Sequence, residues 1–218
     1  VPPLGRQTDG DRLAGRVLRG QQPGAAHVEH PRPGPLGSPG AQLGSDVHDV
    51  LRRGARALIL DLRENGGGLL DEGVNVASIF IPDGTIVTTR GRSQPTQVYV
   101  AKGGAIPTSI PMVVLVDHDT ASAAEIVTAA LQQRGRAKVV GTATYGKGVF
   151  QEIEPVPGGG ALDITVGEYF TPNGSNLGGG GVREGHGIKP NVYVAEPTNT
   201  TRDVQLSAAE RTVAAEVR

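Results

Sequence analysis

Ser122 lies in a turn where a nucleophile would be well placed. The turn reads DHDTAS at residues 117–122; it follows a short apolar run at residues 113–116 and precedes AAEIVTAALQQ, whose apolar residues recur at helical spacing. A serine at the entry to a helix lies beside backbone N–H groups that have no partner inside the helix and can stabilise an oxyanion. The neighbours Ala121, Ala123 and Ala124 leave room for a substrate carbonyl. These features make Ser122 a candidate nucleophile.

The same turn also matches a helix cap. Ser122 and Glu125 have the spacing of a capping box, in which the serine side chain accepts from the third helical N–H and the glutamate reaches back to the serine N–H. Caps are much commoner than nucleophiles. The turn by itself therefore leaves both interpretations open.

Lys147 is the candidate base for Ser122. It is one of only four lysines in the chain, and it lies between Gly146 and Gly148, ahead of a strand-like run, VFQEIEPV. A lysine that acts as a base must be neutral, and removing the proton from an unperturbed lysine at pH 7 costs about 4.6 kcal/mol. Burial in an apolar pocket can supply a shift of that size. On local sequence alone, an exposed loop lysine remains an alternative.

Three other kinds of site are disfavoured. A phosphate-binding P-loop would need a serine or threonine after Lys147, but the next residue is Gly148 and a strand-like run follows instead of a helix. A Ser-His-Asp triad would need a histidine held by an acid, and His118, four residues from Ser122 along a turn, does not have that geometry. No HExxH or equivalent ligand spacing indicates a metal site.

Residues 117–151 read DHDTASAAEIVTAALQQRGRAKVVGTATYGKGVFQ. This segment resembles the catalytic segment of the carboxy-terminal processing proteases, also called tail-specific proteases, of the S41 serine peptidase family. The spacing from Ser122 to Lys147 matches that family's. Further matches are LILDLRENGGGLLDEGVNVASIFIPDG, GEYFTPNGSNL and GHGIKPNVYV, and together they cover roughly residues 51–203 in order.

The resemblance implies a mechanism. A neutral lysine, oriented by a glutamine four residues later, would take the serine proton, and two backbone N–H groups would stabilise the oxyanion. Without the resemblance, the three glycines after Asn65 would be interpreted as a flexible connection from a strand to a helix. No metal and no organic cofactor is implied. The implied site residues are Ser122, Lys147 and Gln151 for catalysis, and Ala123 with Gly66 or Gly67 for the oxyanion hole.

The implied function is a serine endopeptidase that cleaves protein or peptide substrates near exposed carboxy termini. Two alternatives remain open. One is an inactive or truncated peptide-binding relic of the same fold, which binding without turnover would favour. The other is a crotonase-like acyl-transfer enzyme, because glycine-bounded oxyanion holes also serve thioesters. Thioester turnover unaffected by Lys147→Met would favour that second alternative.

The elements around these residues predict an α/β core. Residues 57–62, ALILDL, form a continuous apolar run typical of a strand covered on both faces. A helix is expected over residues 69–80, a strand pair at 86–89 and 97–100, and a further strand at 161–170. The resemblance implies the ClpP/crotonase type of fold, a spiral of β-strands with packed helices.

We expect three segments along the chain. Residues 1–44 hold seven of the 16 prolines, nine glycines and no aromatic residue, so we expect them to be disordered or an aberrant, out-of-frame translation. Residues 45–203 would form the protease core, and residues 204–218 a helical tail that begins at a capping box of Ser207 and Glu210. Family members usually carry a signal or anchor segment and a PDZ domain upstream. Because no PDZ domain is recognisable here, we expect a fragment, with any membrane anchor upstream of it.

Composition excludes several classes of function. The net charge of −1 and the isoelectric point near 6.6 indicate no general affinity for nucleic acid or anionic membranes. The absence of cysteine excludes disulfides and thiolate metal sites. No run of 18 apolar residues predicts a membrane span. A location in the bacterial periplasm or cell envelope is implied by the family alone.

Overall fold

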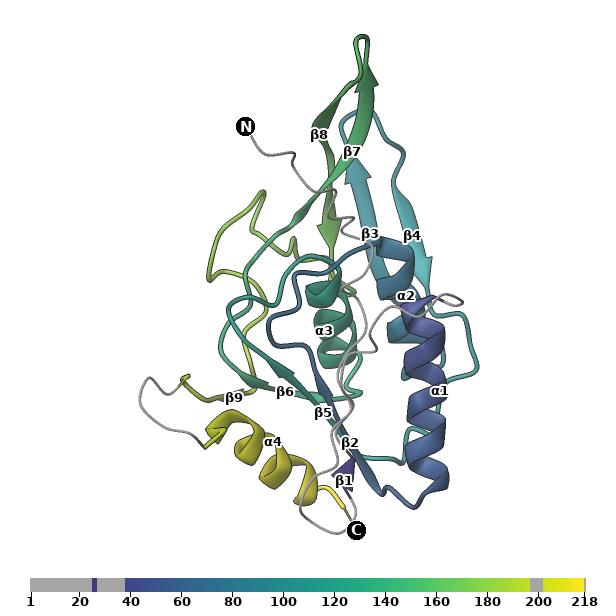
Figure 1. Cartoon of the computed structure of the whole chain (residues 1–218), viewed down its shortest axis with the longest axis vertical. Coiled ribbons are helices and arrows are strands. Elements are labelled where there is room, and N and C mark those ends of the chain that lie inside the picture. Colours follow the sequence, from purple (N-terminus) through teal and green to yellow (C-terminus); the bar gives the residue numbers. More distant parts are fainter. Residues whose placement is uncertain (1–24, 27–37, 197–201, 218) are drawn as a thin grey trace.

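A five-stranded sheet lies at the centre of the protein. The computed structural model describes residues 25–26, 38–196 and 202–217. Every neighbouring pair of strands in this sheet is parallel. In spatial order the strands are β1 (Ala25–Ala26), β2 (Ala57–Asp61), β5 (Met112–Val116), β6 (Lys138–Gly141) and β9 (Val192–Tyr193), as Figure 1 shows.

The central strands are buried on both faces. Every residue of β2 and of β5 is buried. Along β2, Leu58 and Leu60 belong to one hydrophobic cluster, whereas Ala57 and Ile59 belong to a second cluster on the opposite face. Alternation between two apolar environments explains why this strand has no polar position in its interior. The expected strand at residues 57–62 is confirmed, ending one residue earlier than predicted.

Helices cover both faces of the parallel sheet. Residues of α1 (Pro39–Arg52), α2 (Leu70–Ser78) and α3 (Ala123–Gln133) pack into the larger cluster, and residues of α4 (Val204–Ala214) pack into the other, on the opposite side in Figure 1. The bounds of α3 are those that the apolar periodicity predicts. The longest helix, α1, has 14 residues, and no helix in the described part of the chain has the length and apolar character to cross a membrane.

A second sheet of four antiparallel strands stands beside the first. Its order is β4 (Gln97–Val100), β3 (Thr85–Gly91), β8 (Gly160–Phe170) and β7 (Val149–Val156). The expected strand pair is therefore confirmed as β3 and β4. The base of the sheet packs on the core, where the rings of Phe150 and Tyr169 lie 5.3 Å apart. The far end of the β7–β8 hairpin projects from the body of the molecule (Figure 1).

The carboxy-terminal helix starts earlier than predicted. Asp203 is its N-cap, and the Asp203 Oδ1 accepts from the Leu206 N–H at 2.8 Å. Ser207 lies inside the helix, where its hydroxyl donates to the Asp203 carbonyl, so the predicted cap at Ser207 is wrong. The reason lies in tertiary structure: both Asp203 oxygens accept hydrogen bonds from Arg63, at the end of β2, at 3.0 and 2.9 Å. This contact ties α4 to the central sheet.

The first helix begins inside residues 1–44, the segment expected to be disordered or aberrant. Its N-cap is Ser38, whose hydroxyl accepts from the Ala41 N–H at 3.3 Å. Leu43 is fully buried, and the Gly40 N–H donates to the Glu72 carboxylate on α2 at 2.9 Å. Residues 38–44 are thus folded, contrary to the expectation for residues 1–44. Average composition concealed this helix because its glycines serve close packing on α2.

Ala25 and Ala26 differ from that expectation too, because they pair with Ala57 and Leu58 of β2. The remainder of residues 1–37 lies outside the described residues. The hypothesis of an aberrant translation concerns mainly those residues.

Leu43→Ala tests whether α1 belongs to the core. We expect the free energy of unfolding to fall by about 2–5 kcal/mol, because a fully buried leucine leaves a cavity. Urea unfolding followed by circular dichroism measures it. Ser45→Ala, at an exposed position of the same helix, is the control and should change stability by less than about 0.5 kcal/mol. Equal effects of the two substitutions would show that the helix does not pack as described.

Candidate active site

Three loops meet at one edge of the parallel sheet. The glycine loop (residues 62–68) follows β2, the serine loop (residues 117–122) follows β5, and the lysine loop (residues 142–148) follows β6. β2, β5 and β6 are adjacent and parallel, so their carboxyl ends lie side by side. Ligand sites in open α/β sheets occur at this edge. The topology thus brings together motifs that are far apart in the sequence.

Asp117 connects the serine loop to the glycine loop. Its carboxylate is 5% exposed, and both of its oxygens accept from the Glu64 N–H at 3.0 Å. A second connection runs from the Ala121 N–H to the Asn65 carbonyl at 2.9 Å. Burial raises the pKa of Asp117, while its hydrogen bonds from Glu64, Thr120 and Asp119 act in the opposite direction. The two loops are therefore fixed to each other through backbone groups.

Glu125 connects the serine loop to the lysine loop. The Glu125 Oε2 accepts from the N–H of Ser122 and from the N–H of Lys147, each at 2.9 Å. The Tyr145 N–H also donates to the Thr120 carbonyl at 2.9 Å. The backbone nitrogens of Ser122 and Lys147 consequently share one acceptor atom.

The backbone of Ser122 is strained. Its φ and ψ are 54° and −120°, whereas the N-caps of the other three helices in the described chain have φ between −66° and −72°. A positive φ in a residue other than glycine costs roughly 1–3 kcal/mol and is concentrated at functional sites. A strained turn from a strand into a helix is the geometry that presents the serine nucleophile in α/β-hydrolases. The capping contact from Glu125 forms, but the backbone of Ser122 is not that of an ordinary cap.

Two backbone N–H groups close to Ser122 have no partner within the described part of the chain. Among the described residues, none accepts a hydrogen bond from the N–H of Ala123 or of Gly66. The Gly67 N–H, in contrast, donates to the Asn65 Oδ1 at 3.0 Å. Of the two glycines predicted for an oxyanion hole, Gly66 is the one with a free donor.

Gly67 allows the glycine loop to approach Ser122. Its φ is +91°, and a Cβ added there would lie 2.8 Å from the Ala123 nitrogen and 2.9 Å from the Ser122 Cβ. Any side chain would therefore collide with the nucleophile turn. The glycine-rich sequence is required here by close contact and by a positive φ, which a merely flexible connection would not need.

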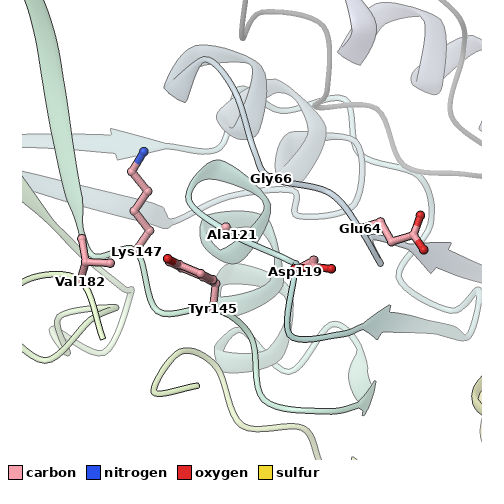
Figure 2. Close-up of a pocket in the computed structure, with 7 residues that line it drawn as sticks. All are labelled: Glu64, Gly66, Asp119, Ala121, Tyr145, Lys147 and Val182. Carbon is pink, nitrogen blue, oxygen red and sulfur yellow. The ribbon is translucent and has the colours of Figure 1, made fainter. Parts of the chain in front are cut away.

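A pocket of about 540 Å³ lies beside this turn. Figure 2 shows the carboxylates of Glu64 and Asp119 at one end and Lys147 beside Tyr145 at the other, with Ala121 between them. Lys147 is half-buried, and no described carboxylate forms an ion pair with it. The complete lining is Glu64, Gly66, Asp119, Ala121, Tyr145, Lys147 and Val182.

Gln151 is not brought to Lys147 in this structure. Its side chain is exposed on β7, it does not line the pocket, and no hydrogen bond joins it to Lys147. A bulge between Phe150 and Gln151 shifts the register with β8. Spacing along a strand could not reveal this shift. The orienting role of Gln151 stays a prediction.

The exposure and contacts of His118 do not support a catalytic role. Its ring is 58% exposed, and it contacts Glu196 at 3.0 Å and Asp119 at 3.5 Å instead of Ser122. No group of three or more histidine and carboxylate side chains in the described part of the chain could hold a metal ion.

Several residues of the site escaped sequence analysis. In the sequence, Glu125 fits a capping box with Ser122, and nothing local shows that its carboxylate also accepts from the lysine loop. Asp117 had a detectable signal, because an aspartate after a buried strand often accepts from loop N–H groups. Tyr145 and Val182 line the pocket without any signal in the sequence.

The comparisons with known proteins show the family of this chain. The model of "Peptidase family S41" matches residues 37–194, which is more than half of the chain. The chain belongs to peptidase family S41. Its carboxyl-terminal-processing relative from Synechocystis is 39% identical over 164 residues, covering 75% of this chain and 38% of the relative. The corresponding protease of Bartonella bacilliformis is 41% identical over 143 residues, covering 65% of this chain and 32% of the relative. The S41 chain therefore spans about a third of the length of these relatives.

Solved structures show the same mixed α/β fold. The photosystem II D1 C-terminal processing protease matches with a TM-score of 0.63 and 32% identity, covering 80% of the S41 chain and 43% of that protein. A lipoprotein from Streptococcus agalactiae matches with a TM-score of 0.69 at 18% identity, covering 94% of this chain and 70% of that one, and so shows the fold alone.

Gly67→Ala tests the close approach of the glycine loop. We expect a loss of about 1 kcal/mol from backbone strain and a further loss of about 1–3 kcal/mol from overpacking against the Ser122 turn. Gly174→Ala is the matched control, since Gly174 has φ +84° and nothing within 4 Å of an added Cβ. Urea unfolding of both variants measures the difference. Equal losses would contradict the close packing.

Glu196→Gln tests the electrostatics beside the serine loop. The hydrogen bond that the His118 ring donates to the Glu196 carboxylate raises the pKa of His118 above its usual value. The His118–Glu196 pair should therefore increase the free energy of unfolding below about pH 6.5, the pKa of histidine in the unfolded state. This contribution should be lost as the pH rises through the pKa of His118 in the folded protein. We expect the substitution to lower the His118 pKa in an NMR titration. Asp119→Asn, which removes the longer contact, should lower it less; an unchanged His118 pKa in Glu196→Gln would refute this assignment.

Proposed function

We propose that this chain is the core of a serine endopeptidase in which Ser122 is the nucleophile and Lys147 the general base. The observation that supports this most is the strained strand-to-helix turn at Ser122, flanked by free N–H groups and fixed to the backbone of Lys147. Ordinary capping does not explain the positive φ. An exposed loop lysine does not explain the half-buried place of Lys147 in the pocket.

In the acylation step, the neutral Lys147 amine takes the proton of the Ser122 hydroxyl as its oxygen attacks the peptide carbonyl carbon. The carbonyl oxygen becomes an oxyanion, which the N–H groups of Ala123 and Gly66 stabilise. The carbon–nitrogen bond then breaks, and the lysine ammonium protonates the departing amine. The product is an acyl-enzyme on Ser122.

In the deacylation step, Lys147 removes a proton from water, which attacks the ester carbonyl. The same two N–H groups stabilise the second oxyanion, and the proton returns to the Ser122 oxygen as the acid product leaves. The cycle restores a neutral lysine. Gln151 would orient the lysine if its side chain turns inward from β7, and Gln151→Ala tests that role separately.

The names of the relatives indicate the substrate class. They are carboxyl-terminal-processing proteases, one of them named for the photosystem II D1 protein. We propose that this chain likewise acts on proteins with exposed carboxy termini. A site of action in the bacterial periplasm or cell envelope is proposed from the family alone.

Ser122→Ala and Lys147→Ala test the dyad. Each substitution should lower cleavage of a loosely folded protein with an apolar carboxy terminus by at least about 10³-fold, because members of a nucleophile–base pair act as a unit. Product formation by mass spectrometry measures it. Lys102→Ala, which removes a lysine remote from the pocket, is the control and should retain activity.

Equal cleavage by the parent and both variants would refute the assignment of Ser122 and Lys147. Substrate binding without cleavage by the parent would support the peptide-binding relic instead. Thioester hydrolysis that survives Lys147→Met would support the acyl-transfer alternative.

A further inference from the structure

Glu125 is a fully buried carboxylate whose partners all belong to two loops. The Ser122 and Lys147 N–H groups donate to its Oε2, each at 2.9 Å. The Gly146 N–H donates to Oε1 at 2.7 Å, and the Thr144 hydroxyl donates to the same oxygen at 2.5 Å. Each of the four donors therefore lies in the serine loop or the lysine loop.

No positive side chain in the described part of the chain compensates this carboxylate. Among the described residues, no lysine, arginine or histidine forms an ion pair with Glu125. Burial raises its pKa, whereas the four hydrogen bonds act in the opposite direction. A buried charge without a counterion is costly unless its hydrogen bonds are complete. The hydrogen bonds to the two loops are thus what stabilises the ionised form.

The backbone of Gly187 packs closely against one side of the carboxylate. A Cβ added to Gly187 would lie 2.1 Å from the Glu125 Oε1 and 2.1 Å from the Thr144 Oγ1, so the backbone of Gly187 closes that side. Thr144 is itself held by the Ile188 N–H at 2.7 Å. The position of the carboxylate is consequently fixed by its environment.

We propose that Glu125 is the positioning residue that sets the nucleophile relative to its base. One carboxylate oxygen accepts from the N–H groups of Ser122 and Lys147. The other accepts from the Gly146 N–H and the Thr144 hydroxyl, in the same loop as Lys147. It touches neither substrate nor the transferred proton. Its kinetic consequence rests on the proposed peptidase function. A displacement of about 1 Å within a catalytic pair can cost 10²-fold in rate.

Only a carboxylate of this length fits the role. A glutamine offers one acceptor oxygen and two N–H donors, so its amide would face the N–H of Gly146 in one orientation and those of Ser122 and Lys147 in the other. An aspartate keeps the charge but is one methylene shorter. The pair Glu125→Gln and Glu125→Asp therefore separates charge from reach.

The experiment measures kcat and KM for these two variants on a peptide that the parent cleaves, at a temperature at which circular dichroism shows every variant folded. We expect kcat to fall at least about 30-fold in both, with KM within about threefold of the parent value. Thr128→Val is the matched control. Thr128 is equally buried on the same helix, and its hydroxyl bonds only to the Ala124 carbonyl, so kcat should stay within about twofold.

A second measurement does not depend on turnover. In the amide spectrum of the 22.5 kDa protein, Glu125→Gln should shift the signals of Ser122, Gly146 and Lys147 together. Thr128→Val should leave all three in place. The amide shifts therefore report on the hydrogen bonds that join the two loops to Glu125, even if no substrate is cleaved.

The outcomes are distinguishable. Shifted amides with a fall in kcat support both proposals. If the amide signals shift in Glu125→Gln but the parent cleaves no substrate, the peptidase function is refuted. The connection of the two loops through Glu125 is then still supported. Unmoved amides, an unchanged kcat in Glu125→Gln, or full activity in Glu125→Asp would each overturn the positioning role.

Discussion

Hydrogen bonds to two buried carboxylates hold the site together. Asp117 accepts from the glycine loop and Glu125 from the lysine loop, while both residues flank the turn that contains Ser122. Loop N–H groups at the edge of a sheet have no strand partner, and inside a protein they must find an acceptor. An ionised carboxylate satisfies several of them at once and forms stronger bonds than a neutral group. The loops are therefore rigid although they contain five glycines between residues 62 and 68 and between residues 142 and 148.

The parallel sheet supplies the scaffold for this arrangement. Its three central strands have apolar residues on both faces and are covered by helices on both sides. Such a core is close-packed and has little freedom to shift. Strain at Ser122 persists because the strand before it and the helix after it are each fixed by burial. Backbone strain of this kind survives only where the surroundings over-determine it.

Helix contacts extend this rigidity to the glycine loop. Gly73 on α2 lies close enough to α3 that an added Cβ would be 3.3 Å from the Ala123 carbonyl. On the other face, Arg63 bonds to Asp61 and to Asp203, joining the start of the glycine loop to the cap of α4. Burial lowers the pKa of Arg63, but its hydrogen bonds to Asp61 and Asp203 and their negative charges outweigh that effect and raise the pKa above its usual value. The guanidinium thus stays charged between two carboxylates.

Local patterns predicted those parts of the protein that depend on local physics. Apolar periodicity predicted the bounds of α3 and the strands around it, because an element that is buried on one or two faces has apolar residues at a regular spacing along the chain. Local patterns missed the start of α1 and placed the cap of α4 wrongly. The start of α1 is decided by packing on α2, and the cap of α4 by Arg63, which lies 140 residues away.

The sequence by itself determined the residue types at the site: a serine entering a helix, a lysine between glycines and a glycine-rich loop after a buried strand. Only the tertiary structure decided that these loops share one sheet edge, that Gly66 instead of Gly67 keeps a free N–H, and that Gln151 faces outward. The physical reason is that donors are matched to acceptors across the fold. The Glu125 oxygens meet groups up to 22 residues away, and no local pattern records that distance.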